Sequence, residues 1–96
     1  MKLQYDSTAD AASVEVDGPT TPGRAAYTEE LDQDRIVDFD ADERVIQYEF
    51  LNVRRYGVRL DDLEHRDQLA RLFAEAGFRE RTWSTPSPAP QGQGRQ

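Results

Sequence analysis

The stretch "RVIQYEFLNV", residues 44–53, decides the fold that the sequence predicts. Its apolar residues recur at every second position, which is the period of a β-strand. Ile46, Tyr48 and Phe50 share one side of this strand. A strand with apolar residues on both sides is typical of the centre of a sheet that is covered on both faces. The second side is interrupted by two polar residues and carries Val45, Leu51 and Val53.

Shorter segments with the same alternation precede this strand, and turn-forming residues separate them. The predicted strands are residues 2–5, 12–16, 24–31 and 35–39. Glycine, proline and aspartate mark the loop at 17–23 and the turns at 32–34 and 40–43. This pattern indicates an antiparallel sheet of four to five strands.

An amphipathic helix is predicted after the strands, at about residues 66–77. One apolar stripe with helical spacing runs along it: Leu69, Leu72, Phe73 and Ala76. Gly77 suits the left-handed residue that follows a last helical turn, and Phe78 suits the hydrophobic contact that often accompanies it. The predicted fold class is therefore α+β, a small antiparallel β-sheet of four to five strands followed by one C-terminal amphipathic helix.

Length and composition indicate a single domain, residues 1–83, and a tail, residues 84–96. The tail reads "STPSPAPQGQGRQ" and has no large apolar side chain, so we expect it to be disordered and Trp83 to be the last side chain that packs. The chain has no cysteine, which excludes disulfides and thiolate metal sites. It has no signal-peptide pattern and no apolar run of membrane-spanning length, so we expect a cytoplasmic protein without membrane contact.

The net charge of −7 is concentrated in the first half of the chain. Residues 1–50 carry 13 acidic and 4 basic side chains, whereas residues 51–96 carry 6 acidic and 8 basic ones. An acidic body repels phosphate backbones, so we expect no direct binding of nucleic acid. The same surface would attract a basic protein partner, although many small proteins are acidic for solubility alone.

Two aspartates lie four residues apart in "YDSTADAASVEV", residues 5–16. On one helical turn Asp6 and Asp10 could share a cation, but hard cations usually require six or more oxygen ligands. The simpler interpretation is structural, with the Asp6 carboxylate accepting the amide of Thr8 or Ala9 at a tight turn before the next strand. We therefore expect no metal and no cofactor at this corner.

Two other acidic features have similar alternatives. "DFDADE", residues 38–43, begins like a calcium-binding loop but lacks its glycine and its terminal glutamate, so a turn is the better interpretation. Glu49 is a carboxylate in the most apolar strand, and it is either an isolated acid or the partner of Arg24, Arg35 or Arg44 across the sheet. We prefer the ion pair.

No catalytic residues are predicted. His65 is the only histidine and lies near the expected helix start, and no nucleophile, phosphate-binding loop or metal-ligand cluster is recognisable. We therefore expect a protein that is not an enzyme. Two alternatives stay open: a structural or accessory protein, and a metal-binding protein or enzyme that uses Glu49, Asp6 and Asp10.

Two segments of the chain resemble a small bacterial family, the domain-of-unknown-function family 2283. Its members open with a Y-D-x-x-A-D-A stretch, which is matched here by Tyr5, Asp6, Ala9, Asp10 and Ala11. A later V-D-x-D-x-x-G-x-V-x-G-I-E-I-L segment is matched by Asp38, Asp40, Val45, Glu49, Phe50 and Leu51. Family glycines are replaced by Glu43 or Arg44 in the turn and by Gln47 in the strand, which leaves the turn type open.

The resemblance, over residues 3–53, implies a small β-rich domain with no established catalytic residues. It also implies an antitoxin role for part of the family, whose members lie beside genes for small RNase-like toxins. The acidic half of this chain would suit neutralisation of a basic toxin, and the chain lacks a basic N-terminal arm for DNA. The function expected is thus a non-enzymatic interaction domain, antitoxin-like or otherwise inhibitory, with a basic protein partner.

The sequence also predicts a homodimer. A single helix covers only one face of a sheet of four or five strands, and exposed apolar patches usually mark an interface. A second copy could cover the remaining face by two-fold symmetry. The interface residues predicted in this way are Val45, Leu51 and Val53.

Overall fold

The computed structural model describes residues 1–19, 21 and 23–81. The chain divides into two compact units, Met1–Gly57 and Val58–Gln96. The predicted tail and Trp83 lie outside the described residues. Neither helix in the described ranges has the length and apolar character that a membrane crossing requires.

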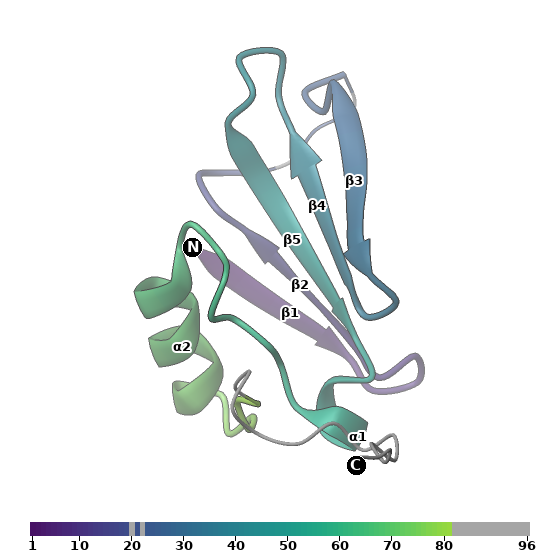
Figure 1. The fold of residues 1–96 in the computed structure, drawn as a ribbon, viewed down its shortest axis with the longest axis vertical. Coiled ribbons are helices and arrows are strands. Elements are labelled where there is room, and N and C mark those ends of the chain that lie inside the picture. The colour runs from purple at the N-terminus through teal and green to yellow at the C-terminus, as the bar shows by residue number, and fades with distance from the viewer. Residues whose placement is uncertain (20, 22, 82–96) are drawn as a thin grey trace, which may run out of the picture. The chain divides into compact units, whose positions relative to one another are not determined.

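The first unit is a five-stranded antiparallel sheet followed by one short helix, α1 (Val53–Tyr56). Figure 1 shows the strands side by side in the order β1-β2-β5-β4-β3, with β5 in the centre. The strands are β1 (Lys2–Asp6), β2 (Ala11–Glu15), β3 (Tyr27–Asp32), β4 (Arg35–Phe39) and β5 (Val45–Leu51). The predicted α+β class and sheet are confirmed, including the central position of the strand "RVIQYEFLNV".

One face of this sheet is buried. Successive side chains of a strand point to opposite faces, and nearly all of those that point to this face are apolar. In β5 this face carries Ile46, Tyr48 and Phe50, and each of the three is 1–2% exposed. Ala12 lies opposite Phe50 in the register, and the neighbouring strands complete the face with Val14, Val37 and Arg35. The burial of these apolar side chains is the main stabilising contribution of the sheet.

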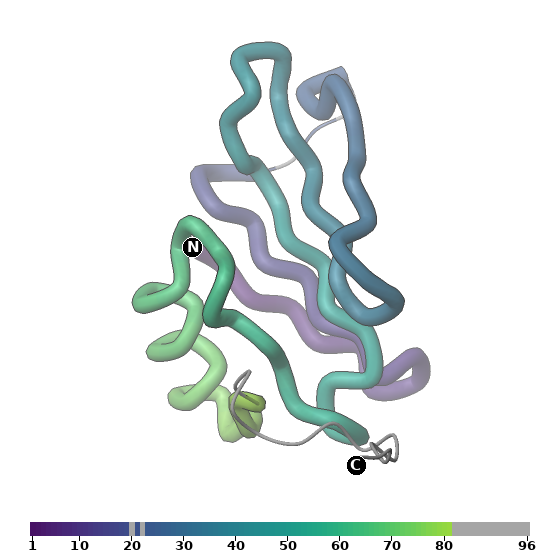
Figure 2. Tube along the Cα trace, in the orientation of Figure 1, coloured from purple at the N-terminus to yellow at the C-terminus, as the bar shows by residue number. Residues whose placement is uncertain are grey.

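The central strand is shorter than predicted. β5 ends at Leu51, because Asn52 adopts a left-handed conformation with φ 55° and Val53 begins α1. Asparagine is among the few residues that tolerate this conformation. Val53 is 0% exposed, so the prediction that it lies on an exposed strand face as an interface residue is wrong. Figure 2 shows the turn of the backbone from β5 into α1.

The second unit contains the predicted helix, α2 (Arg66–Glu75), whose N-cap is His65. Leu69 and Phe73 are buried, as the apolar stripe predicts. The helix ends as predicted in a Schellman motif: the N–H of Gly77, at φ 88°, donates to Ala74 O (3.0 Å), and the N–H of Phe78 donates to Phe73 O (2.9 Å). The rings of Phe73 and Phe78 lie 6.0 Å apart in an edge-to-face contact.

Candidate functional site

The β1–β2 turn is held by Asp6. Its Oδ1 accepts the backbone N–H groups of Thr8 at 2.9 Å and Ala9 at 3.4 Å. Both bonds are local, and a short aspartate side chain is suited to them because it reaches the backbone two to three residues ahead. The predicted structural role of Asp6 is confirmed.

Asp10 has a longer-range role at the same corner. It occupies the left-handed region with φ 52°. Its Oδ1 and Oδ2 accept the N–H groups of Arg54 (2.9 Å) and Arg55 (3.2 Å), and its backbone oxygen accepts the N–H of Val53 (3.1 Å). Asn52 makes no side-chain cap hydrogen bond, so Asp10 caps α1 from a turn more than forty residues earlier in the chain.

Tyr5 completes this corner. Its hydroxyl donates to Asp10 Oδ1 at 2.7 Å, and the Arg54 guanidinium lies 5.4 Å from the centre of its ring. The N–H of Arg54 and the hydroxyl of Tyr5 hold the pKa of Asp10 below its ordinary value. The carboxylate in turn raises the pKa of the Tyr5 hydroxyl, mainly through the hydrogen bond that it accepts.

The carboxylates of this corner have structural hydrogen-bond partners. Asp6 and Asp10 direct their carboxylates to different backbone donors instead of converging on one point. Within the described part of the chain, no group of three or more His, Asp or Glu side chains could hold a metal ion. The corner closes the β1–β2 hairpin and begins α1.

The turn "DFDADE" is built on Asp40, which is buried. Its Oδ1 accepts the N–H groups of Asp42 and Arg44, both at 2.9 Å, and its Oδ2 accepts Arg44 Nε at 3.0 Å. The N–H of Arg44 is the main reason that the pKa of Asp40 lies below its ordinary value. Glu43 has φ 62°, so Glu43, not Arg44, occupies the left-handed position of this turn, a conformation that favours glycine.

The outer face, as we call the side of the sheet opposite the buried one, is polar and acidic. Glu49 lies between Ser13 and Ile36 in the register, and Gln47 lies between Glu15 and Asp38. All six side chains are half-exposed. The outer face consists of Lys2, Gln4, Asp6, Ala11, Ser13, Glu15, Thr28, Glu30, Ile36, Asp38, Val45, Gln47, Glu49 and Leu51.

Among the described residues, the predicted ion pair of Glu49 with Arg24, Arg35 or Arg44 is not formed. Arg35 pairs with Asp32 at 2.9 Å on the buried face, because it lies opposite Phe50 in the register. The other two arginines are engaged elsewhere: Arg44 with Asp40 and Asp42, and Arg24 with the backbone oxygen of Pro19 at 2.9 Å. Glu49 thus presents its carboxylate on the outer face beside a serine and an isoleucine.

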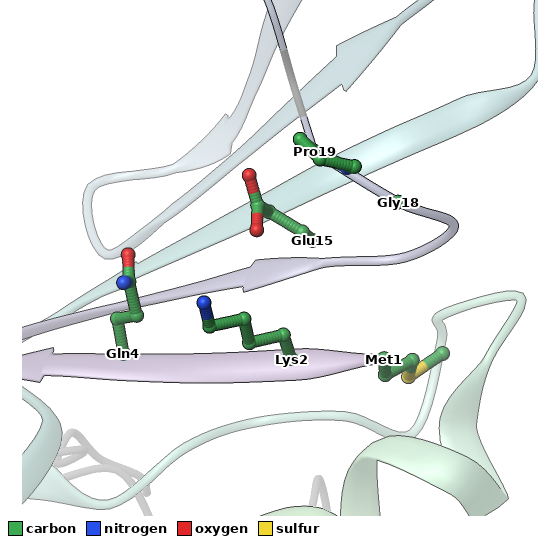
Figure 3. A pocket seen from close by; sticks show the side chains of 6 residues that line it. All are labelled: Met1, Lys2, Gln4, Glu15, Gly18 and Pro19. Atoms are coloured by element: carbon green, nitrogen blue, oxygen red, sulfur yellow. The ribbon is translucent and has the colours of Figure 1, made fainter.

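A hollow of about 440 Å³ lies at the β1 edge of the outer face. Figure 3 shows the side chains of Lys2, Gln4 and Glu15 pointing to the side on which Pro19 lies. Met1 and Gly18 complete its lining. Lys2 and Glu15 are register partners, so the charges at this hollow are of both signs, and the net negative charge lies farther along the outer face.

Sequence reasoning missed two of these features. The donors to the Asp10 carboxylate lie 44 and 45 residues away, and no pattern among neighbouring residues predicts a contact over that separation. The second missed feature is the acidic character of the outer face, where Gln47 lies between Glu15 of β2 and Asp38 of β4, beside Glu49 of its own strand. Only the register of the strands brings these carboxylates onto one surface.

The family comparison covers the sheet and both aspartate turns. Residues 2–54, more than half of the chain, match the model of a family described as "Protein of unknown function (DUF2283)". Neither the comparison with curated proteins nor that with solved structures gave a match. The matched segment begins at β1 and ends after the capped start of α1. This chain therefore belongs to the DUF2283 family of proteins of unknown function.

Proposed function

We propose that this protein is a non-enzymatic interaction domain that binds a basic protein partner through the outer face. One observation carries the proposal: the strand register gathers Glu15, Asp38 and Glu49 on this face, with Glu30 next to them on β3. Lys2, at the β1 edge, is the one basic side chain of the outer face.

The chemistry of this face suits a protein better than a small ligand. The carboxylates are spread over adjacent strands, so they match a surface with several arginines or lysines. Ile36, Val45 and Leu51 are half-exposed among them and add apolar contact area. Charge complementarity of this kind speeds association and excludes partners of the wrong sign.

An antitoxin-like, inhibitory action is the specific form that we propose. An enzyme that acts on RNA needs a basic surface for the phosphate backbone. An acidic sheet face is complementary to such a surface, and a protein bound there would exclude the nucleic acid. The half-exposed carboxylates of Glu15, Asp38 and Glu49 support this role.

The test uses the full chain and the product of the gene adjacent to its own, if that product is basic. The two proteins should co-purify, the affinity should fall with added salt, and the partner's nuclease activity should decrease on binding. Glu15→Lys/Glu49→Lys should weaken binding by at least about tenfold, because each like charge opposed to a basic surface is unfavourable.

A matched control places the same charge change in the second unit. Glu64 and Glu75 are exposed there, so Glu64→Lys/Glu75→Lys should bind like the wild type. Equal affinity of the outer-face variant and the wild type would overturn the proposal.

A second copy of this chain is the other candidate occupant of the outer face. The half-exposed aliphatic side chains Ile36, Val45 and Leu51 favour it, whereas the acidic side chains around them oppose it. Light scattering at micromolar concentration distinguishes the two states: a mass near twice 11.0 kDa supports the homodimer. Leu51→Arg should then give a monomer, and a wild-type mass of one chain at every concentration excludes the dimer.

A further inference from the structure

Strand β3 is a free edge of the sheet. The strand order places it at one end, where it pairs with β4 and with no other described strand. Its first four residues, 27–30, are exposed. An edge strand directs a row of backbone N–H and C=O groups outward, which another extended segment can pair with.

Two adjacent glutamates mark this edge. Glu29 lies opposite Val37 and Glu30 opposite Ile36, so their side chains project on opposite sides of the sheet. Among the described residues, no side-chain hydrogen bond or ion pair engages either carboxylate. A segment added along β3 would therefore meet one carboxylate on each side.

An exposed aromatic ring lies at the start of the same strand. Tyr27 is 46% exposed, and Phe39 stacks on it with 4.8 Å between ring centres and 15° between ring planes. One face of the Tyr27 ring is thus covered and the other is open. Partial desolvation raises the pKa of Tyr27, and the nearby charges of Glu43, Glu29 and Asp40 add to this effect.

These features favour a basic occupant over a second copy. Two β3 strands from different copies would bring Glu29 and Glu30 against their own equivalents, which is unfavourable. The register shift between Glu30 and Asp32 also interrupts regular pairing at that end. A basic strand finds the opposite situation, with carboxylates on both sides and an aromatic face that attracts a guanidinium or ammonium group.

We propose that the free edge of β3 pairs with an extended basic segment of the protein partner, with an arginine or lysine over the open face of Tyr27. This inference rests on the proposed function and specifies its binding mode. The adjacent basic residues of the segment contact Glu29 on one side of the sheet and Glu30 on the other. Backbone pairing supplies the geometry, and the charges select the partner.

The probe is an acetylated and amidated hexapeptide, Thr-Val-Arg-Arg-Val-Thr, titrated into the full chain and followed by amide NMR shifts. We expect the largest shifts at residues 27–32. Glu29→Gln/Glu30→Gln should weaken binding about threefold to tenfold, as two exposed ion pairs are lost. Tyr27→Leu, which keeps an apolar side chain without the π face, should weaken it about twofold to fivefold.

Two controls separate strand pairing from charge. A peptide of the same sequence, N-methylated at alternate residues, keeps both arginines but cannot donate along the edge, so it should bind much more weakly. Glu64→Gln/Glu75→Gln removes the same charge from the second unit and should bind like the wild type.

Equal affinity for both peptides, or shifts outside β3, would overturn the edge-pairing proposal. Its failure is distinguishable from failure of the proposed function. A basic protein partner that is lost with Glu15→Lys/Glu49→Lys but retained with Glu29→Gln/Glu30→Gln would leave the outer face as the binding surface and exclude the β3 edge.

Discussion

The aspartates at the strand ends and the glutamates on the sheet use negative charge in different ways. Asp6, Asp10 and Asp40 accept backbone N–H groups and hold turns or the start of a helix. The carboxylates of Glu29 and Glu30, on exposed edge positions, accept no side-chain or backbone hydrogen bond from any described residue. The shorter aspartate side chain reaches nearby backbone, whereas glutamate projects beyond it. Acidic residues at the turns therefore maintain the fold, whereas the fold does not use the carboxylates of the two β3 glutamates.

Asp10→Ala should produce the largest effect of a single substitution. It removes the acceptor for two backbone N–H groups and for the Tyr5 hydroxyl, and it places alanine at φ 52°. We expect the Tm to fall by about 5–10 °C in a thermal melt. Asp10→Asn keeps an acceptor and tolerates this φ, so its Tm should fall less than that of Asp10→Ala. A Tm unchanged in Asp10→Ala would contradict the capping role.

The aspartates at the turns should also make the stability of the protein fall in the acid pH range. The pKa values of Asp10 and Asp40 lie below their ordinary value in the folded protein, so the unfolded chain binds protons more readily. Their contribution is present above the unfolded pKa of about 4 and is lost as the pH falls through the lower folded values. The Tm should be level from pH 7 to about 5 and should decrease below about 4, less steeply in Asp10→Asn.

Glu43→Gly should stabilise the turn that Asp40 holds. A residue with a Cβ is strained at φ 62°, and glycine removes this strain while increasing the entropy of the unfolded chain. We expect a net gain of about 0.5–1 kcal/mol in the free energy of unfolding, measured with urea. Ala41→Gly, in the same turn but without positive φ, is the matched control and should be neutral or destabilising. A lower free energy of unfolding in Glu43→Gly would show instead that the Glu43 carboxylate stabilises the turn.

Glu49→Gln should have the smallest effect on stability and still affect binding. Its carboxylate lies on the outer face beside Ser13 and Ile36, and such surface changes usually alter stability by no more than about 0.5 kcal/mol. The same variant should weaken binding of the basic partner. If urea denaturation instead shows a loss above about 1 kcal/mol, Glu49 belongs with the structural aspartates.

Much of the architecture was predictable because local patterns encode it. The alternation in β5, the apolar stripe of α2 and the left-handed glycine at its end are properties of neighbouring residues. Asp6 was predictable for the same reason, since its acceptor role spans two to three residues. The pattern predicts the end of β5 two residues too late, because Val53 continues the alternation but begins a helix.

By itself, the sequence determined the α+β class, the central strand, the helix with its termination, and the acidic balance of the first half. Tertiary structure alone decided that Asp10 caps α1, that Val53 is buried, and that Glu15, Asp38 and Glu49 share a face. The physical reason is the range of the interactions. Periodicity acts between neighbouring residues, whereas strand register and a cap 44 residues away exist only once the chain has folded.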